Sequence, residues 1–284
     1  MVNALGYSKK FKEKAYTANG VYSRSGNLPL IITAPHGGLL KPESIPNRIG
    51  DGSAILGDMY TKDIALGIEQ FIVDHYGNGA PYVVVNNISR RKADPNRSLE
   101  EGTETEAGEQ VWKAYHGRVK DAVESVLQMS LYGLLVDIHG HTHSSGMIEL
   151  GYLLSPDELR SDKARLDQAI LEKSSIQSLA KRHVKTKAPH RLLGLFGDSI
   201  MKSSNNQISV LPSSTIPSPH DGDYFMGGFT TQHYHNYWNG LDVVQVEIPK
   251  HLRWNKENRQ HVIRAISLAI IKMLDQYYLH YSKL

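Results

Sequence analysis

Five short runs along the chain are almost entirely apolar and rich in Val, Ile and Leu. Runs of this length and composition are typical of strands that are buried on both faces of a sheet. The predicted strands are Leu28–Ala34, Tyr82–Ile88, Leu134–His139, Ile148–Leu154 and Asp242–Ile248.

Longer stretches between and after these runs repeat their apolar residues at i, i+3, i+4 and i+7, as amphipathic helices do. Alternating strands and helices predict an α/β fold, with a mixed, mostly parallel central sheet and helices on both of its faces. No internal repeat, linker or low-complexity block interrupts the chain, so we expect one domain over residues 1–284. The predicted helices are Tyr60–Tyr76, about Glu104–Leu131, about Ser161–Lys185 and about Asn255–Leu279.

The segment Ser203–Asn239 has neither pattern and contains prolines, glycines and several aromatic residues. Long stretches without regular structure inside a compact domain are often lids or binding loops. The alternative is a solvated excursion on the surface. Because of its aromatic residues, we expect this segment to form one wall of an active site.

Composition narrows the possible functions. The 284 residues have a net charge of +3, without a basic stripe, which argues against a nucleic-acid partner. The absence of cysteine excludes disulfides, cysteine zinc sites and a thiol nucleophile. The N-terminus has no apolar secretory core and no stretch is long enough to span a membrane, so we expect a soluble, cytoplasmic protein.

Residues able to bind a metal or a carboxylate follow four of the predicted strands. In open α/β sheets, ligands bind beyond the carboxyl ends of the strands, so these residues predict a site there. The sequence has no serine-elbow motif, no P-loop, no dinucleotide fingerprint and no H-E-x-x-H motif. A dinuclear metallophosphatase is disfavoured, because it would have its Asp-x-His motif earlier in the chain and an Asn-His motif later. The four segments are PHGG (Pro35–Gly38), SRRKADPNR (Ser89–Arg97), DIHGHTH (Asp137–His143) and VEIP (Val246–Pro249).

The motifs of the N-formylglutamate amidohydrolase family, which is similar in fold and site plan to the zinc carboxypeptidases, have a similar order and approximate spacing. The resemblance rests on PHGG, SRRKADPNR, DIHGH (Asp137–His141) and VQVEIP (Val244–Pro249). The resemblance extends from about Leu28 to Tyr277. Each motif alone is weak, whereas four in order, each at a strand end, are fairly specific. The resemblance implies one α/β domain, one zinc ion per chain and hydrolysis of an amide bond.

The resemblance also implies a set of metal ligands. His36 and His139 match the two histidines, and Asp58 matches an acid at the start of the following helix, with Glu43 as the alternative carboxylate. Imidazole and carboxylate are the usual ligands of catalytic zinc. The alternatives are a turn histidine at His36 and a helix N-cap at Asp58.

The remaining histidines of DIHGHTH, His141 and His143, would line the mouth of the site or contact the substrate. One histidine of the three, His139, is thus expected to bind the metal.

The segment DPNR resembles the Asp-x-Asn-Arg motif of the family. The resemblance implies that Arg97 and Asn96 hold a substrate carboxylate, while Asp94 orients them and Arg90 polarises the scissile carbonyl. The alternative is a basic, solvated turn.

Glu247 is a lone carboxylate in the apolar run VVQVEI. A buried carboxylate is costly unless it is paired or bound to a metal. The resemblance makes Glu247 the general base that transfers a proton from water to the leaving amine. A salt bridge to Arg253 or Arg259 is the alternative.

Taken together, the sequence predicts a zinc-dependent amidohydrolase that acts on N-formylglutamate or another N-acylated acidic amino acid. A carboxypeptidase-like hydrolase of short acidic peptides is the nearest alternative. A non-catalytic, metal-dependent receptor for acidic ligands is a second hypothesis of another class. The sequence leaves the oligomeric state open.

Overall fold

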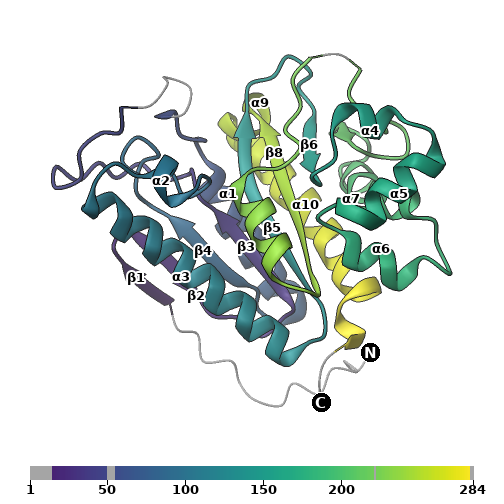
Figure 1. The fold of residues 1–284 in the computed structure, drawn as a ribbon, viewed down its shortest axis with the longest axis horizontal. Coiled ribbons are helices and arrows are strands. Elements are labelled where there is room, and N and C mark those ends of the chain that lie inside the picture. The colour runs from purple at the N-terminus through teal and green to yellow at the C-terminus, as the bar shows by residue number, and fades with distance from the viewer. Residues whose placement is uncertain (1–14, 50–54, 221, 282–284) are drawn as a thin grey trace.

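An eight-stranded mixed sheet forms the centre of the computed structural model, which describes residues 15–49, 55–220 and 222–281 (Figure 1). The strand order is β1-β2-β4-β3-β5-β8-β6-β7. The strands are β1 (Ala15–Ala18), β2 (Val21–Arg24), β3 (Leu30–Ala34), β4 (Tyr82–Asn86), β5 (Gly133–His141), β6 (Ile148–Gly151), β7 (Val210–Leu211) and β8 (Leu241–Pro249).

The four central strands β4, β3, β5 and β8 are parallel, whereas β1, β2 and β6 pair antiparallel with their inner neighbours. The predicted mixed sheet with a parallel centre is therefore confirmed. In the register of β8, Glu247 lies beside His139 of β5 on one side and beside Glu149 of β6 on the other. This register places three ionisable side chains in one row across the adjacent strands β5, β8 and β6.

Helices cover both faces of the sheet, as predicted. Side chains alternate across each strand, so Leu30 and Ile32 join one core and Ile31 joins the other. The first core contains apolar residues of α1 (Thr61–Tyr76), α7 (Pro189–Ser203) and α10 (Lys256–Tyr277), and the second contains those of α3 (Glu106–Met129) and α8 (Phe229–Tyr237).

A lobe of shorter helices lies beyond β6 (Figure 1). It contains α7 together with α4 (Pro156–Arg160), α5 (Lys163–Lys173) and α6 (Gln177–His183). The single helix predicted over about Ser161–Lys185 is wrong, because two serines interrupt it. The Ser174 hydroxyl donates to Ile170 O at 2.8 Å, and the Ser175 hydroxyl donates to Val243 O at 2.6 Å.

The segment Ser203–Asn239 is less irregular than predicted. It begins at the last residue of α7 and contains both β7 and α8. The sequence pattern missed α8 because its residues Phe229–Tyr237 are mostly polar and aromatic, without a clear apolar stripe.

The remaining helical elements are short. They are α2 (Leu99–Gly102), α9 (Lys250–Trp254) and the 3₁₀ helix η2 (Leu279–Tyr281). Among the helices that the structure describes, none combines the length and the apolar character needed to cross a membrane.

Candidate metal centre

The PHGG turn fixes His36 at the carboxyl end of β3. A side chain on Gly37 would place its Cβ 2.4 Å from the Lys62 nitrogen, and one on Gly38 would place it 2.3 Å from the Asn87 carbonyl carbon. Only glycine permits the backbone to approach these groups so closely. The turn is thereby packed between the start of α1 and the end of β4, with the His36 ring buried.

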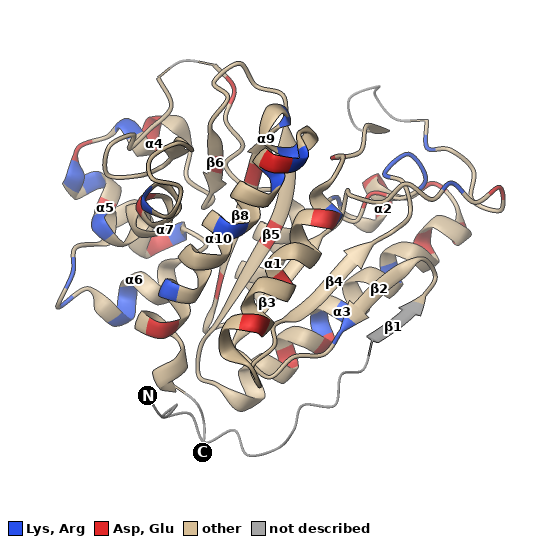
Figure 2. Cartoon of the chain, turned by 180° about the vertical axis from the view of Figure 1, so that it is seen from behind, with Lys and Arg blue, Asp and Glu red and all other residues tan. Residues whose placement is uncertain are grey.

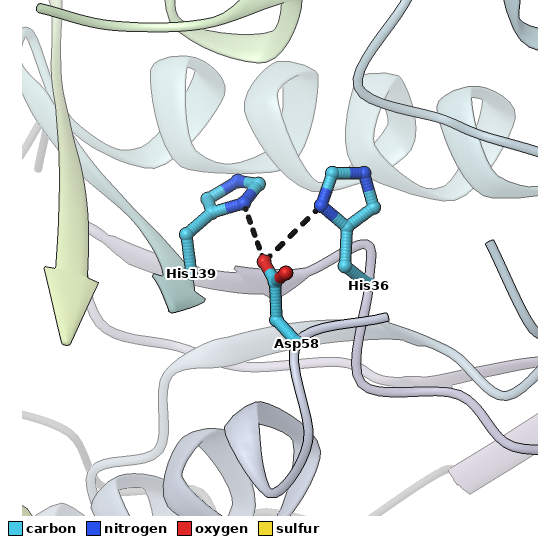
Figure 3. Close-up of side chains that lie close together, drawn as sticks. All are labelled: His36, Asp58 and His139. Carbon is cyan, nitrogen blue, oxygen red and sulfur yellow. Dashed lines mark hydrogen bonds and ion pairs between the residues drawn. The ribbon is translucent and has the colours of Figure 1, made fainter. Parts of the chain in front are cut away.

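Asp58 brings His36 and His139 together (Figure 3). Its backbone nitrogen donates to His36 O at 3.0 Å. Its Oδ2 lies 3.2 Å from His36 Nδ1, 3.3 Å from His139 Nδ1 and 3.2 Å from the Gly140 nitrogen. The Asp58 side chain caps no helix, since the N-cap of α1 is Tyr60.

Of the two carboxylates considered as ligands, Asp58 is the one that joins the histidines. His36, Asp58 and His139 form a group whose ligand atoms all lie within 4.8 Å of one another. Glu43 is exposed and is not part of it.

Two further buried carboxylates hold the outer nitrogens of the histidine rings. His36 Nε2 lies 2.7 Å from Asp94 Oδ1, and His139 Nε2 lies 2.8 Å from Asp137 Oδ2. A carboxylate accepts hydrogen bonds, so these contacts favour a proton on each Nε2, and in the neutral rings each Nδ1 then presents a lone pair toward Asp58. Histidines that bind a metal are usually held in this way.

The buried carboxylates of the cluster favour positive charge between them. Burial opposes ionisation of Asp58, but the two histidines outweigh it and hold the pKa of Asp58 well below its usual range. Burial also disfavours a charged His139, but Asp137 outweighs it and raises the pKa of His139 well above its usual value. Two imidazole nitrogens and a carboxylate oxygen are a donor set that Zn²⁺ accepts.

Glu247 lies next to this cluster in the sheet register and is 4% exposed. Its Oε1 accepts a hydrogen bond from Gln245 Nε2 at 3.0 Å, and its buried Oε2 has no hydrogen-bond partner among the described residues. Burial, reinforced by the neighbouring carboxylates of Asp58 and Glu149, raises the pKa of Glu247 to about 8.

The salt-bridge alternative for Glu247 does not match the contacts that the structure gives. The Arg253 guanidinium donates to three carbonyl groups, those of Ile248, Met59 and His141. Arg259 donates to the carbonyl of Arg253.

Three arginines surround Asp94. Arg90 Nε donates to Asp94 Oδ2 at 2.7 Å, while Arg97 Nε lies 3.5 Å and an Arg48 nitrogen 3.7 Å from the same oxygen. The sequence analysis missed Arg48, which is buried and also donates to the carbonyls of Arg90 and Glu101. Arg97 is the most accessible of the three, with 40% of its side chain exposed.

Asn96 and the backbone around it tie the DPNR segment to two helices. Asn96 Oδ1 accepts from the Thr230 nitrogen at 2.8 Å, in the first turn of α8. From α3, His116 Nε2 lies 2.8 Å from Pro95 O, and Trp112 donates to Arg97 O. Burial lowers the pKa of His116 to about 4, so it is neutral at pH 7.

A second group of metal-ligand types contains His141, His143 and Glu149. His141 is buried, with Nε2 2.9 Å from Met147 O and Nδ1 accepting from the His143 nitrogen at 3.1 Å. Both ring nitrogens are therefore engaged, which leaves neither free for a substrate. Glu149 Oε1 lies 2.9 Å from His143 Nδ1, and its Oε2 accepts from the Phe225 nitrogen at 2.9 Å.

The sequence analysis missed three carboxylate roles. Asp137 could have been predicted, because it precedes His139 by two residues and so lies on the same face of the strand. Asp94 was expected to orient Arg97 and Asn96, and its bond to His36 was not foreseen. The only feature of the sequence that points to Glu149 is its position as a lone acid in an apolar strand, like that of Glu247.

The fold resembles two solved structures. N-formylglutamate amidohydrolase from Ralstonia eutropha matches with a TM-score of 0.55 and 12% identity, over 92% of this chain and 98% of that one. A gene product of Agrobacterium tumefaciens matches with a TM-score of 0.50 and 13% identity, over 89% of this chain and 94% of that one. The expected resemblance to the first protein is thus confirmed at the level of the fold.

Comparison of the sequence itself gives no further relative. No protein-family model matches the chain, and no curated protein matches it.

Proposed function

We propose that the protein is a zinc-dependent amidohydrolase that holds one zinc ion per chain with His36, Asp58 and His139. The observation that carries this proposal is the row of groups at one edge of the sheet, where three metal-ligand atoms converge beside the buried Glu247 carboxylate. When bound, zinc supplies the Lewis acidity that polarises an amide carbonyl and makes water easier to deprotonate.

Glu247 is the general base of the proposed reaction. Its Oε2 takes a proton from water and returns it to the leaving nitrogen, while the C–N bond breaks and a C–O bond forms. Gln245 holds Oε1 of the same carboxylate, so the other oxygen remains available for the proton.

The arginines around Asp94 select an acidic substrate. Arg97 anchors the substrate carboxylate, since its guanidinium is the most accessible of the three. Arg90 lies against Asp94, which is bonded to the ligand His36, and steadies the negative charge that develops on the carbonyl oxygen. Asn96 contributes its side-chain nitrogen, because its oxygen holds α8.

The part of Ser203–Asn239 from Tyr224 to Gly228 forms one wall of the proposed site. The Phe225 nitrogen donates to Glu149, and the Gly228 nitrogen donates to Gln245 Oε1 at 2.7 Å. These bonds hold the segment against two residues of the same sheet face as Glu247. The proposed substrate is N-formylglutamate or another N-acylated acidic amino acid.

The test is the turnover of the zinc-loaded Glu247→Gln variant on N-formylglutamate, other N-acyl acidic amino acids and short acidic peptides. Glutamine nearly matches glutamate in shape but exchanges no proton. We expect kcat to fall by about 10²–10⁴-fold, with melting temperature and zinc content unchanged. Glu172→Gln, an exposed carboxylate of α5, is the matched control.

A stable, zinc-loaded Glu247→Gln protein with undiminished kcat would contradict this mechanism. Turnover by the wild type should also stop when a chelator removes the metal. If the wild type binds zinc and acidic ligands but hydrolyses none of these compounds, the protein is a receptor rather than an enzyme. Faster cleavage of the peptides than of the N-acyl amino acids would favour the carboxypeptidase-like alternative.

A further inference from the structure

A groove of about 870 Å³ lies in the helical lobe, away from the metal cluster. Helices α4, α5 and α7 and the segment from Pro212 to Ser218 line it. None of its lining residues belongs to the metal cluster or to the arginines around Asp94. Its volume falls in the range of about 300–1,000 Å³ that is typical of small-molecule sites.

The floor of the groove is apolar. Leu159, Leu166 and Leu193 line it and are 3%, 7% and 2% exposed. Pro212 and Pro217 add further apolar lining. A hydrocarbon chain laid on these residues would be removed from water, which favours binding.

The rim of the groove is cationic. Lys163, Lys187 and Arg191 line it, and none of them forms an ion pair with a carboxylate in the part of the chain that the structure describes. Lys187 instead donates to the Tyr277 hydroxyl at 2.9 Å. Figure 2 shows lysines and arginines in blue on α4, α5 and α7, the helices that surround the groove.

The acidic groups near the groove are already engaged. Asp198 is the one carboxylate among the lining residues, and its Oδ1 accepts from the Ser214 nitrogen and hydroxyl. Two further lining residues have partners outside the groove: Arg160 pairs with Asp157 and His190 with Asp167. Lys163, Lys187 and Arg191 therefore outnumber the one lining carboxylate, which leaves a net positive charge above an apolar floor.

We propose that this groove binds an amphipathic carboxylate, a molecule with one anionic head and a medium-length hydrocarbon chain. The chain lies on the leucine floor, and the carboxylate is held by Arg191 and Lys163. An arginine guanidinium matches a carboxylate with two parallel hydrogen bonds, and a lysine adds a point charge. This site is separate from the proposed reaction and does not depend on it.

The experiment measures binding of dodecanoate to the full zinc-loaded chain by calorimetry. Arg191→Glu and Lys163→Glu reverse charges on the rim, and both residues are exposed, so the fold should be retained. We expect each variant to bind dodecanoate at least about ten times more weakly than the wild type, since a favourable charge pair becomes repulsive. Lys185→Glu, an exposed lysine outside the groove, is the control and should bind as the wild type does.

Two related probes test the two halves of the site. Butanoate has the same head but a short chain and should bind far more weakly than dodecanoate. Dodecyltrimethylammonium has the chain but a positive head, so the cationic rim should repel it.

Several results would overturn the proposal. Equal dodecanoate affinities for Arg191→Glu, Lys163→Glu and the control would mean that the rim does not hold the carboxylate. Equal affinities for dodecanoate and butanoate, or stronger binding of an acidic peptide, would mean that the apolar floor plays no part. Complete competition by N-acetylglutamate would place dodecanoate at the metal centre instead of in the groove.

Discussion

Two clusters in this protein place a carboxylate oxygen near two imidazole Nδ1 atoms, and only one of them suits a cation. In the first, Asp58 Oδ2 lies 3.2 Å from His36 and 3.3 Å from His139. In the second, Glu149 Oε1 lies 2.9 Å from His143 and 3.8 Å from His141. The residue types and distances are similar, so these alone do not distinguish the two clusters.

The hydrogen-bond partners of the outer ring nitrogens distinguish the two clusters. Asp94 and Asp137 favour protons on the outer nitrogens of His36 and His139, so in the neutral rings two Nδ1 lone pairs face Asp58 Oδ2, which also accepts from the Gly140 nitrogen. Such an arrangement is unfavourable unless extra protons or a cation lie between the acceptors. A divalent ion satisfies all three at once.

In the second cluster, donors already face acceptors. The His143 nitrogen donates to His141 Nδ1, and the Phe225 nitrogen and the His143 ring donate to Glu149. Because each acceptor has its donor, this cluster needs no further donor, and it holds the backbone at Phe225. Outer hydrogen bonds, rather than ligand types, therefore distinguish the two clusters.

Removing one histidine from each cluster gives the largest expected contrast. Wild-type protein should contain about one zinc ion per chain. His139→Ala should lose most of this zinc, because a ligand is gone, whereas His143→Ala should retain it. Metal analysis of the purified variants measures the difference. Equal zinc contents in the two variants, or two zinc ions in the wild type, would contradict the expectation that only the first cluster binds zinc.

Removing the charge of one carboxylate, Asp137 next to the first cluster or Glu149 in the second, tests the contrast between the clusters further. Asp137→Asn keeps the shape of the side chain that holds His139 but weakens its hold on the ring proton. We expect the zinc affinity to fall by about 10–100-fold, as measured by competition with a chromogenic chelator. Glu149→Gln is the matched control and should leave zinc affinity unchanged. A loss of affinity in Glu149→Gln as large as in Asp137→Asn would assign Glu149 to the metal.

The smallest expected effect is on stability in the second cluster. In Glu149→Gln, one donor among the Phe225 nitrogen and the His143 ring loses its acceptor in a partly buried position, at a cost of about 1 kcal/mol. The melting temperature should fall by roughly 2–4 °C for each kcal/mol, as followed by circular dichroism. An unchanged melting temperature would mean that the wall segment is not held through Glu149.

Most of the elements with a long, uninterrupted pattern were predictable from the sequence. The apolar runs of β3, β4, β5, β6 and β8 and the periodic α1, α3 and α10 lie where the sequence predicts them, because their patterns reflect burial directly. The β1–β2 hairpin, β7, α7 and α8 were missed. The short or mixed sequences of β1, β2, β7 and α8 form strands and a helix only because of neighbours supplied by the rest of the chain. Helix α7 was missed although its apolar residues are periodic and buried.

The sequence by itself determined which residue types stand at the strand ends, and therefore that His36, His139 and Glu247 meet at one edge of a parallel sheet. Only the tertiary structure decided how they are held, because hydrogen bonds between residues far apart in the chain leave no local pattern. It places Asp58, and not Glu43, against the two histidines, bonds Asp94 to His36 and engages both ring nitrogens of His141. Those partners favour a proton on the outer nitrogen of each of the rings of His36 and His139.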